Sequence, residues 1–432
     1  MRWWITIALV VGGGGVLLGA GSAGSRATRV AEPPRRRAAA VREQDIAFYE
    51  ARAARDPYGA RDRAALAALY LDRGRATGSE SDVRRAEALA RGSLATRHAR
   101  NDGAAAVLAS ALMMQHRFPE AYDLTAARLR GDSGDAVTRA TLGEIALELG
   151  RYAEADQLFG SLTLFRATPA VGPRYARWLE LSGRSGQARE LLRELRDSLA
   201  LGFRTTPDQL AWYDVRLGEL AARHGRADLA RAALARALAE QPEDPRALVA
   251  LGQVELRTGH PDRARDLGTR ALEQRLDPAA LILLAEAAEA AQDSAAAQQF
   301  ASALDVAVSQ AGTGFHRAWG LFLLDRGRRV EELRARAVAE LASRRDVHGL
   351  DLAAWATFRA GDAAAAAPLA DEALARGVED ATLLYHGGRI ALALGDTAMA
   401  GRRLAAALAI DPAFDLRHAA ETRDLLARLG RR

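Results

Sequence analysis

Apolar and small residues recur along most of this chain with the spacing of α-helices, and the helical segments come in pairs. In residues 217–237, apolar positions return every three or four residues, which places them on one side of a helix. Gly225 interrupts this run near its middle, and Pro242 follows its end. Because glycine tolerates the left-handed backbone that closes a helix, the stretch predicts two helices joined by a tight turn.

The same pattern returns at a nearly fixed interval. Leu217, Gly218, Gly225, Ala230 and Ala237 have equivalents 34 positions later, namely Leu251, Gly252, Gly259, Ala264 and Ala271. Further turn positions stand at Gly150, Gly183, Gly327, Gly361 and Gly395. Glycine and alanine have almost no side chain, so the two helices of one unit can cross closely at such positions. The sequence therefore predicts an array of helical hairpins.

After the first stretch, the fullest set of positions is Leu142-Gly143, Gly150, Tyr152, Ala155 and Phe159. This pattern resembles the tetratricopeptide repeat, which is W-x₂-L-G-x₂-Y…A-x₃-F…P with a period of about 34 residues. The resemblance implies an all-α fold, a right-handed superhelical solenoid of about ten helix-turn-helix repeats over residues 61–413. It also implies a non-enzymatic scaffold that binds a protein or peptide on its concave face.

Three units depart from the regular spacing. The first is about one helical turn longer than the others, which predicts an extended hairpin with a polar tip at 77–82. Residues 201–209 add a longer loop between two helices. Glu332 stands where other units have alanine, so the unit at 315–344 either packs less tightly or is shifted in register.

The two ends of the chain differ from the repeats. Residues 1–25 combine Met1-Arg2, an apolar run and small residues, a pattern typical of a signal peptide or an N-terminal membrane anchor. Residues 26–44 have little to bury and are expected to form a disordered tether. We expect capping helices at 45–60 and 414–432, on either side of the solenoid.

Cleavage and retention of the N-terminal segment are both open. Its apolar run is shorter than the about 20 residues that span a membrane, and Gly21 and Ala23 form a small-x-small cleavage point. In either case we expect the repeats to be exported, to the periplasm or the exterior of the cell. The only membrane contact expected is through an uncleaved N-terminal segment.

The amino-acid composition and the motifs limit which kinds of catalytic, metal and nucleic-acid site we expect. The chain has no cysteine, which excludes disulfides, thiolate metal ligands and thiol nucleophiles. Its 60 basic and 55 acidic residues are interspersed without a basic stripe, so no nucleic-acid partner is expected. The eight histidines are scattered, and no phosphate loop, zinc or hydrolase motif occurs. We therefore expect no catalytic, cofactor or metal site, and we interpret Glu144 and Glu148 as a solvated helix face.

The first helix of each repeat lines the concave face, so its inward residues are the candidate partner-binding positions. In the N-terminal half these are mainly acidic, including Glu180 and Glu219, whereas aromatic and arginine residues dominate toward the C-terminus. Aromatic and arginine side chains are enriched at binding hot spots. The candidate partner-binding residues are Trp212, Arg257, Trp355, Phe358, Arg359, Tyr385 and Arg389. For Trp355 and Phe358, ordinary packing between helices is the alternative.

Three functions are compatible with these features. The first is an exported scaffold whose partner is a protein or peptide. The second is a membrane-anchored assembly subunit of an envelope complex, which retention of residues 1–22 would favour. The third is an enzyme whose site is not recognisable from sequence, and the scattered histidines argue against it.

The export pattern makes a direct prediction. The mature chain should begin close to Gly24 and lie outside the cytoplasm, because small residues follow the apolar run. N-terminal sequencing of the protein from its native host measures this. A chain that begins at Met1 and resists carbonate extraction would instead be anchored, and a full-length chain in the cytoplasm would contradict export.

Overall fold

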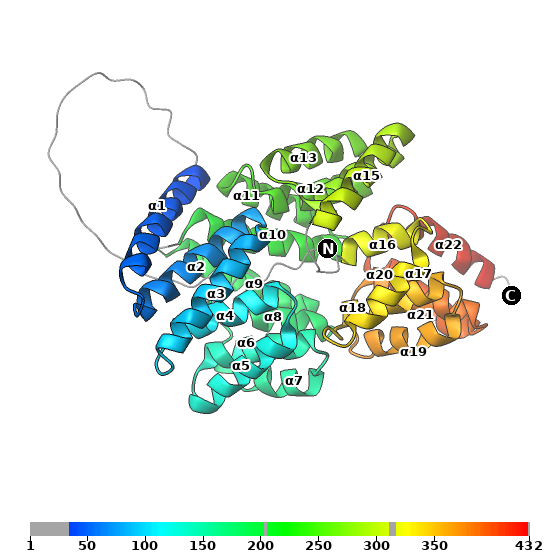
Figure 1. The fold of residues 1–432 in the computed structure, drawn as a ribbon. Coiled ribbons are helices and arrows are strands. Elements are labelled where there is room, and N and C mark those ends of the chain that lie inside the picture. The colour runs from blue at the N-terminus through cyan, green and yellow to red at the C-terminus, as the bar shows by residue number, and fades with distance from the viewer. Residues whose placement is uncertain (1–33, 203–204, 311–316, 431–432) are drawn as a thin grey trace, which may run out of the picture.

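The computed structural model describes residues 34–202, 205–310 and 317–430, and over these ranges the chain forms helices and no β-strand (Figure 1). The helices make ten antiparallel hairpins, numbered here in chain order: α2 (Ala60–Thr77) with α3 (Glu80–Thr96), α4 (Asp102–Met114) with α5 (Phe118–Gly131), α6 (Ala136–Glu148) with α7 (Tyr152–Gly160), α8 (Gly172–Leu181) with α9 (Ser185–Ala200), α10 (Pro207–Arg223) with α11 (Ala227–Glu240), α12 (Pro245–Arg257) with α13 (Pro261–Gln274), α14 (Pro278–Ala290) with α15 (Ser294–Gln310), α16 (Arg317–Asp325) with α17 (Val330–Glu340), α18 (Val347–Arg359) with α19 (Ala363–Leu374), and α20 (Ala381–Ala393) with α21 (Thr397–Ile410). Helices α1 (Pro34–Arg55) and α22 (His418–Leu429) flank the hairpins, and a short 3₁₀ turn, η1 (Thr163–Phe165), follows α7. The predicted all-α solenoid of about ten hairpins is confirmed.

Close approach at small residues holds each hairpin together. A Cβ atom added to Gly143 would lie 2.8 Å from the Phe159 ring, and one added to Gly218 would lie 2.6 Å from Leu234. The alanine at the crossing, Ala230 in the fifth hairpin, is fully buried. These positions have no room for a larger side chain, which explains why the sequence pattern is so regular there.

The irregular units have local explanations. The first hairpin is extended as predicted, because α2 has 18 residues where α12 has 13, and Gly78 (φ 76°) turns the chain into α3. In the eighth hairpin Arg329 also adopts a left-handed conformation (φ 51°), and α17 starts three residues after its turn glycine rather than two. This shifts the register by one position, so that Leu333 is buried where Glu332 was aligned.

The N-terminal boundary lies earlier than the sequence indicated. Residues 34–44, which were expected to belong to a disordered tether, form the first half of α1. The run of alanines that follows Arg37 favours a helix there. Ile46 is buried and packs with Tyr70 and Leu71 of α2. The predicted export segment at 1–25 lies outside the described residues, and none of the described helices is long and apolar enough to cross a membrane.

The superhelix brings into contact hairpins that are five units apart in the chain. Hairpin turns in the first half touch the linkers that follow hairpins in the second half: Gly78 meets Arg275, Gly150 meets Arg345, Gly183 meets Gly377, and Gly225 meets Asp411. Each turn therefore contacts the end of the hairpin five units later. Figure 1 shows the yellow, orange and red C-terminal helices beside the cyan and green ones. The interior of the superhelix is consequently shared by both halves.

The close helix crossings predict that a larger side chain lowers the free energy of unfolding at a crossing position but not at an exposed one. Ala230→Leu should destabilise the protein by about 1–3 kcal/mol, because the buried crossing must move apart to hold the larger side chain. Ala232→Leu makes the same change at an exposed position of the same helix and should cost little. Denaturant unfolding of the two variants measures the difference. Equal midpoints would show that α10 and α11 do not cross at Ala230.

Candidate interaction face

The inward acids of the first half are buried rather than solvated. Glu144 accepts a hydrogen bond from Arg174 at 2.9 Å, and both side chains are at most 4% exposed. Glu148 pairs with Arg177 at 2.5 Å in the same environment. Burial raises the pKa of Glu144, whereas for Glu148 the nearby Arg177 and Arg344 outweigh burial and lower the pKa. The interpretation of this pair as a solvated helix face was therefore wrong.

The second half of the chain covers these acids. Arg344, in the α17–α18 linker, lies 3.3 Å from Glu148 and 3.5 Å from Asp346. His348 in the first turn of α18 is buried, and burial together with Arg317 and other arginines lowers its pKa well below the usual value. The concave face of the third and fourth hairpins is thus occupied by the chain itself.

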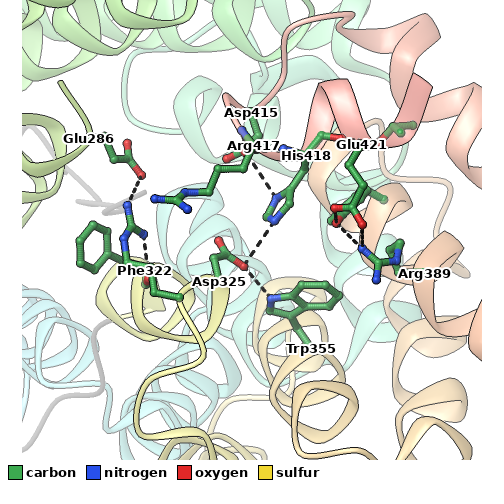
Figure 2. Close-up of polar contacts among 12 residues, drawn as sticks. Glu286, Phe322, Asp325, Trp355, Arg389, Asp415, Arg417, His418 and Glu421 are labelled. Atoms are coloured by element: carbon green, nitrogen blue, oxygen red, sulfur yellow. Dashed lines mark hydrogen bonds and ion pairs between the residues drawn. The ribbon is translucent and has the colours of Figure 1, made fainter. Parts of the chain in front are cut away.

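Trp355 and Tyr385, predicted to anchor a partner, lie in the core. Each is 1% exposed. The Trp355 indole donates to Asp325 at 2.9 Å and its ring stacks on His386 at 4.0 Å. The Tyr385 hydroxyl donates to Glu421 at 2.7 Å (Figure 2 shows the labelled Trp355, Asp325 and Glu421). The physical reason is that the first helices of successive hairpins pack on one another, so the predicted inward stripe falls in their seam.

The other candidate residues are only partly accessible. Phe358 and Arg359 are half-buried against the Trp355 ring, and Arg389 pairs with Glu421. The structure thus brings the five C-terminal candidates together around one seam. It places the remaining two elsewhere, with Trp212 half-buried against Tyr213 and Arg257 paired with Asp411 at 3.4 Å. Their role in binding a partner stays a prediction.

The seam also depends on residues that sequence reasoning missed. Each buried indole finds a carboxylate from a neighbouring helix: Trp178 donates to Asp156 at 2.7 Å, Trp319 to Asp305 at 3.0 Å, and Trp355 to Asp325. His418 stacks on Tyr385 at 4.4 Å and lies 3.3 Å from Asp415. For Trp178 and Trp319 the acid lies in the preceding helix, whereas for Trp355 it ends the helix before that one.

A more accessible stretch of the inner face lies between α12, α14 and α16 on one side and residues 411–417 on the other. We call it the open inner surface, and its residues are Arg257, Glu286, Glu289, Arg326, Asp415 and Arg417. Arg417 reaches across to Glu289 at 2.5 Å, and Arg326 pairs with Glu289 at 2.6 Å. Figure 2 shows Glu286 facing this space together with Arg417 and Asp415. The side chains of Glu286 and Arg417 are 32% and 44% exposed.

Glu286 is an acid of the open inner surface whose charge is poorly compensated by its neighbours. Its carboxylate lies 3.9 Å from Arg326, beyond hydrogen-bonding distance. Burial, with Asp415, Glu289 and Asp325 nearby, raises the pKa of Glu286 to about 7 despite Arg326. For Glu289 the hydrogen bonds from Arg326 and Arg417 outweigh burial, and its pKa is lowered.

The buried polar contacts of the second half include one between a histidine and an aspartate. The histidine with the best-defined partner, His386, is bound to Asp351 at 2.8 Å, which in turn accepts from Arg317 at 2.8 Å. His386 and Asp351 are both buried. Among the described residues, no group of three or more metal-ligating side chains is placed to hold an ion.

The raised pKa of Glu286 predicts a pH-dependent stability. A folded-state pKa above the unfolded value stabilises the protein below the unfolded pKa, and this stabilisation is lost as pH rises through about 7. Glu286→Gln should therefore raise the melting temperature relative to wild type more at about pH 8 than at about pH 5. Glu289→Gln, the control, should lower it at about pH 8, because a paired carboxylate is lost. Thermal unfolding measures both, and the same sign for the two variants at high pH would contradict this electrostatic account.

Comparison with known proteins agrees with this geometry. Residues 215–280 match a family model described as the tetratricopeptide repeat. No curated protein matches. Similar solved structures include PilW, a widely conserved type IV pilus biogenesis factor, with 21% identity over 46% of this chain and 90% of that chain and a TM-score of 0.40.

Two further solved structures resemble larger parts of the chain. The Cut9–Hcn1 hetero-tetramer of APC/C has 12% identity over 91% of this chain and 95% of that chain, with a TM-score of 0.34. A tetratricopeptide repeat protein from Parabacteroides merdae ATCC 43184 has 14% identity over 69% and 100%, with a TM-score of 0.34. At these scores the likenesses carry no argument about function. Residues 215–280 thus match the tetratricopeptide repeat, and helical hairpins of the same kind continue on both sides of them.

Proposed function

We propose that this protein is an exported, non-enzymatic scaffold that binds a polypeptide through its open inner surface. Tetratricopeptide repeats serve as protein-interaction scaffolds, which supports the general class. The sequence pattern at 1–25, which is typical of a signal peptide or membrane anchor, supports the compartment.

One observation carries the choice of surface. The inner face is largely filled by the chain itself, whereas at the open inner surface the side chains of Glu286, Asp415 and Arg417 remain 32%, 33% and 44% exposed. Acids and arginines alternate there, so a partner is offered both donors and acceptors. An extended polypeptide, with its own amides and mixed side chains, fits such a surface better than a polyanion, which the acids would repel.

A membrane-anchored form has a specific observation in its favour. The acids Glu43 and Glu50 of α1 pair with Arg73 and Arg85 of the array. The free side of α1 presents Phe48, which is 56% exposed, and the helix has an excess of arginine. A basic helix with exposed apolar residues is suited to a membrane surface. An uncleaved N-terminal segment would place α1 there, in an assembly subunit of an envelope complex.

Site-specific crosslinking tests the proposed surface. A photoreactive amino acid replaces Gln253, a half-buried inward residue of α12, and as a control replaces Asp228, which is fully exposed on α11. In the native host, one polypeptide should crosslink at position 253 and not at 228. The yield should fall as salt rises, because the surface is charged. Equal labelling at both positions, or none at 253, would contradict the assignment.

A further inference from the structure

A built arginine site lies between the third and fourth hairpins and is filled by the chain itself. The guanidinium of Arg376 donates to both carboxylate oxygens of Asp156, at 2.9 and 3.0 Å, and to the Ser182 hydroxyl at 2.7 Å. The same guanidinium lies over the Tyr152 ring, 4.7 Å from its centroid. We call Tyr152, Asp156 and Ser182 the arginine notch.

The notch is held in shape by Trp178. Its indole donates to Asp156 at 2.7 Å, and its backbone carbonyl accepts from the Ser182 hydroxyl at 2.7 Å. Both polar groups that meet Arg376 are therefore positioned from within the first-half hairpins. A planar guanidinium matches the paired carboxylate oxygens and the aromatic face at once, which a lysine ammonium does not. The geometry selects arginine.

The residues next to Arg376 follow the same surface. The carbonyl of Gly377 meets the turn at Gly183 so closely that a Cβ atom there would clash with it. Val378 is buried in the apolar cluster that contains Trp178 and Leu179. Residues 376–378 thus contact the third and fourth hairpins by a guanidinium, a backbone carbonyl and an aliphatic side chain in turn.

The linker between α17 and α18 makes a similar contact with the turn of the third hairpin. The carbonyl of Arg345 meets the turn at Gly150, where a Cβ atom would lie 2.5 Å away. Val347 joins the same apolar cluster as Val378. Both linkers thus combine a backbone contact at a glycine turn with an aliphatic side chain that packs in the apolar cluster of the first-half hairpins.

We propose that the arginine notch is a recognition site for a polypeptide bearing arginine, a small residue and an aliphatic residue in sequence, and that the α19–α20 linker occupies it as an internal ligand. This inference rests on the proposed scaffold function and adds the chemistry of its partner. A linker of the same chain has a high effective concentration, so it keeps the site closed against weak ligands. A partner segment with the same pattern displaces the linker from the notch.

A peptide added in trans tests this directly. The labelled probe is a synthetic peptide with the sequence of residues 374–382, and the receptor is the full chain carrying Arg376→Ala and Val378→Ser, which empties the notch. This receptor should bind the peptide roughly tenfold or more tightly than wild type, whose notch is occupied. Adding Asp156→Asn to the receptor, or replacing the peptide's arginine by lysine, should remove roughly tenfold of the affinity.

Fluorescence anisotropy gives these affinities without any cellular partner, so its outcome is independent of the crosslinking at Gln253. Equal, weak binding by the emptied receptor and wild type would overturn the proposal. Tight binding that ignores Asp156→Asn or the lysine peptide would also overturn it, because the contact would then not be made in the notch.

A matched pair of glycine variants covers the case in which the emptied receptor fails to fold. Gly183→Ala and Gly395→Ala place alanine at similar left-handed positions (φ 67° and 82°), but only Gly183 touches the distant linker. Hydrogen exchange should increase severalfold at 375–380 in Gly183→Ala and stay unchanged there in Gly395→Ala. Unchanged exchange of that linker in both variants would mean that the contact does not open, which would overturn the proposal.

Discussion

The close crossing of two helices at a glycine and an alanine determines the shape of this protein. At Gly218 and Ala230 the backbones approach until no larger side chain fits, and the same contact recurs at Gly388 with Leu404 and Ala400. Because every hairpin repeats nearly the same crossing, each is rotated against its neighbour in nearly the same way. The accumulated rotation brings hairpin turns and linkers together five units apart.

That closure explains why the interior is charged. Glu144, Glu148, Arg174 and Arg177 occupy positions that would face an open groove, and here each meets an opposite charge. Removing charges from water is costly unless geometry and hydrogen bonds compensate, so such pairs favour one arrangement over others more than they add stability. Breaking a pair is expensive, because it leaves the partner charge buried. The inner face therefore behaves as an internal interface that specifies how the two halves meet.

The two candidate binding regions differ in how their charged groups are paired and hydrated. At the open inner surface the charges remain partly hydrated, and the pKa of Glu286 is raised to about 7 by burial and by the neighbouring acids. At the arginine notch, by contrast, the polar groups are matched and directed at one guanidinium. A surface of the first kind suits adaptable contacts with a mixed partner, and a site of the second kind suits recognition of a defined residue. Arginine supplies every basic contact, since the chain contains no lysine.

The sequence by itself determined the helices, their pairing and the repeat, because the spacing of Gly225, Ala230 and their equivalents acts within about 34 residues. It also indicated the irregular first and eighth hairpins. Only the tertiary structure decided what the inward residues do. Trp355 and Tyr385 have the same helical spacing whether they face a groove or a neighbouring helix, and the superhelical packing placed them in the seam. Likewise, no local pattern links Asp156 to Arg376, because their contact depends on the rotation accumulated between the third and the ninth hairpins.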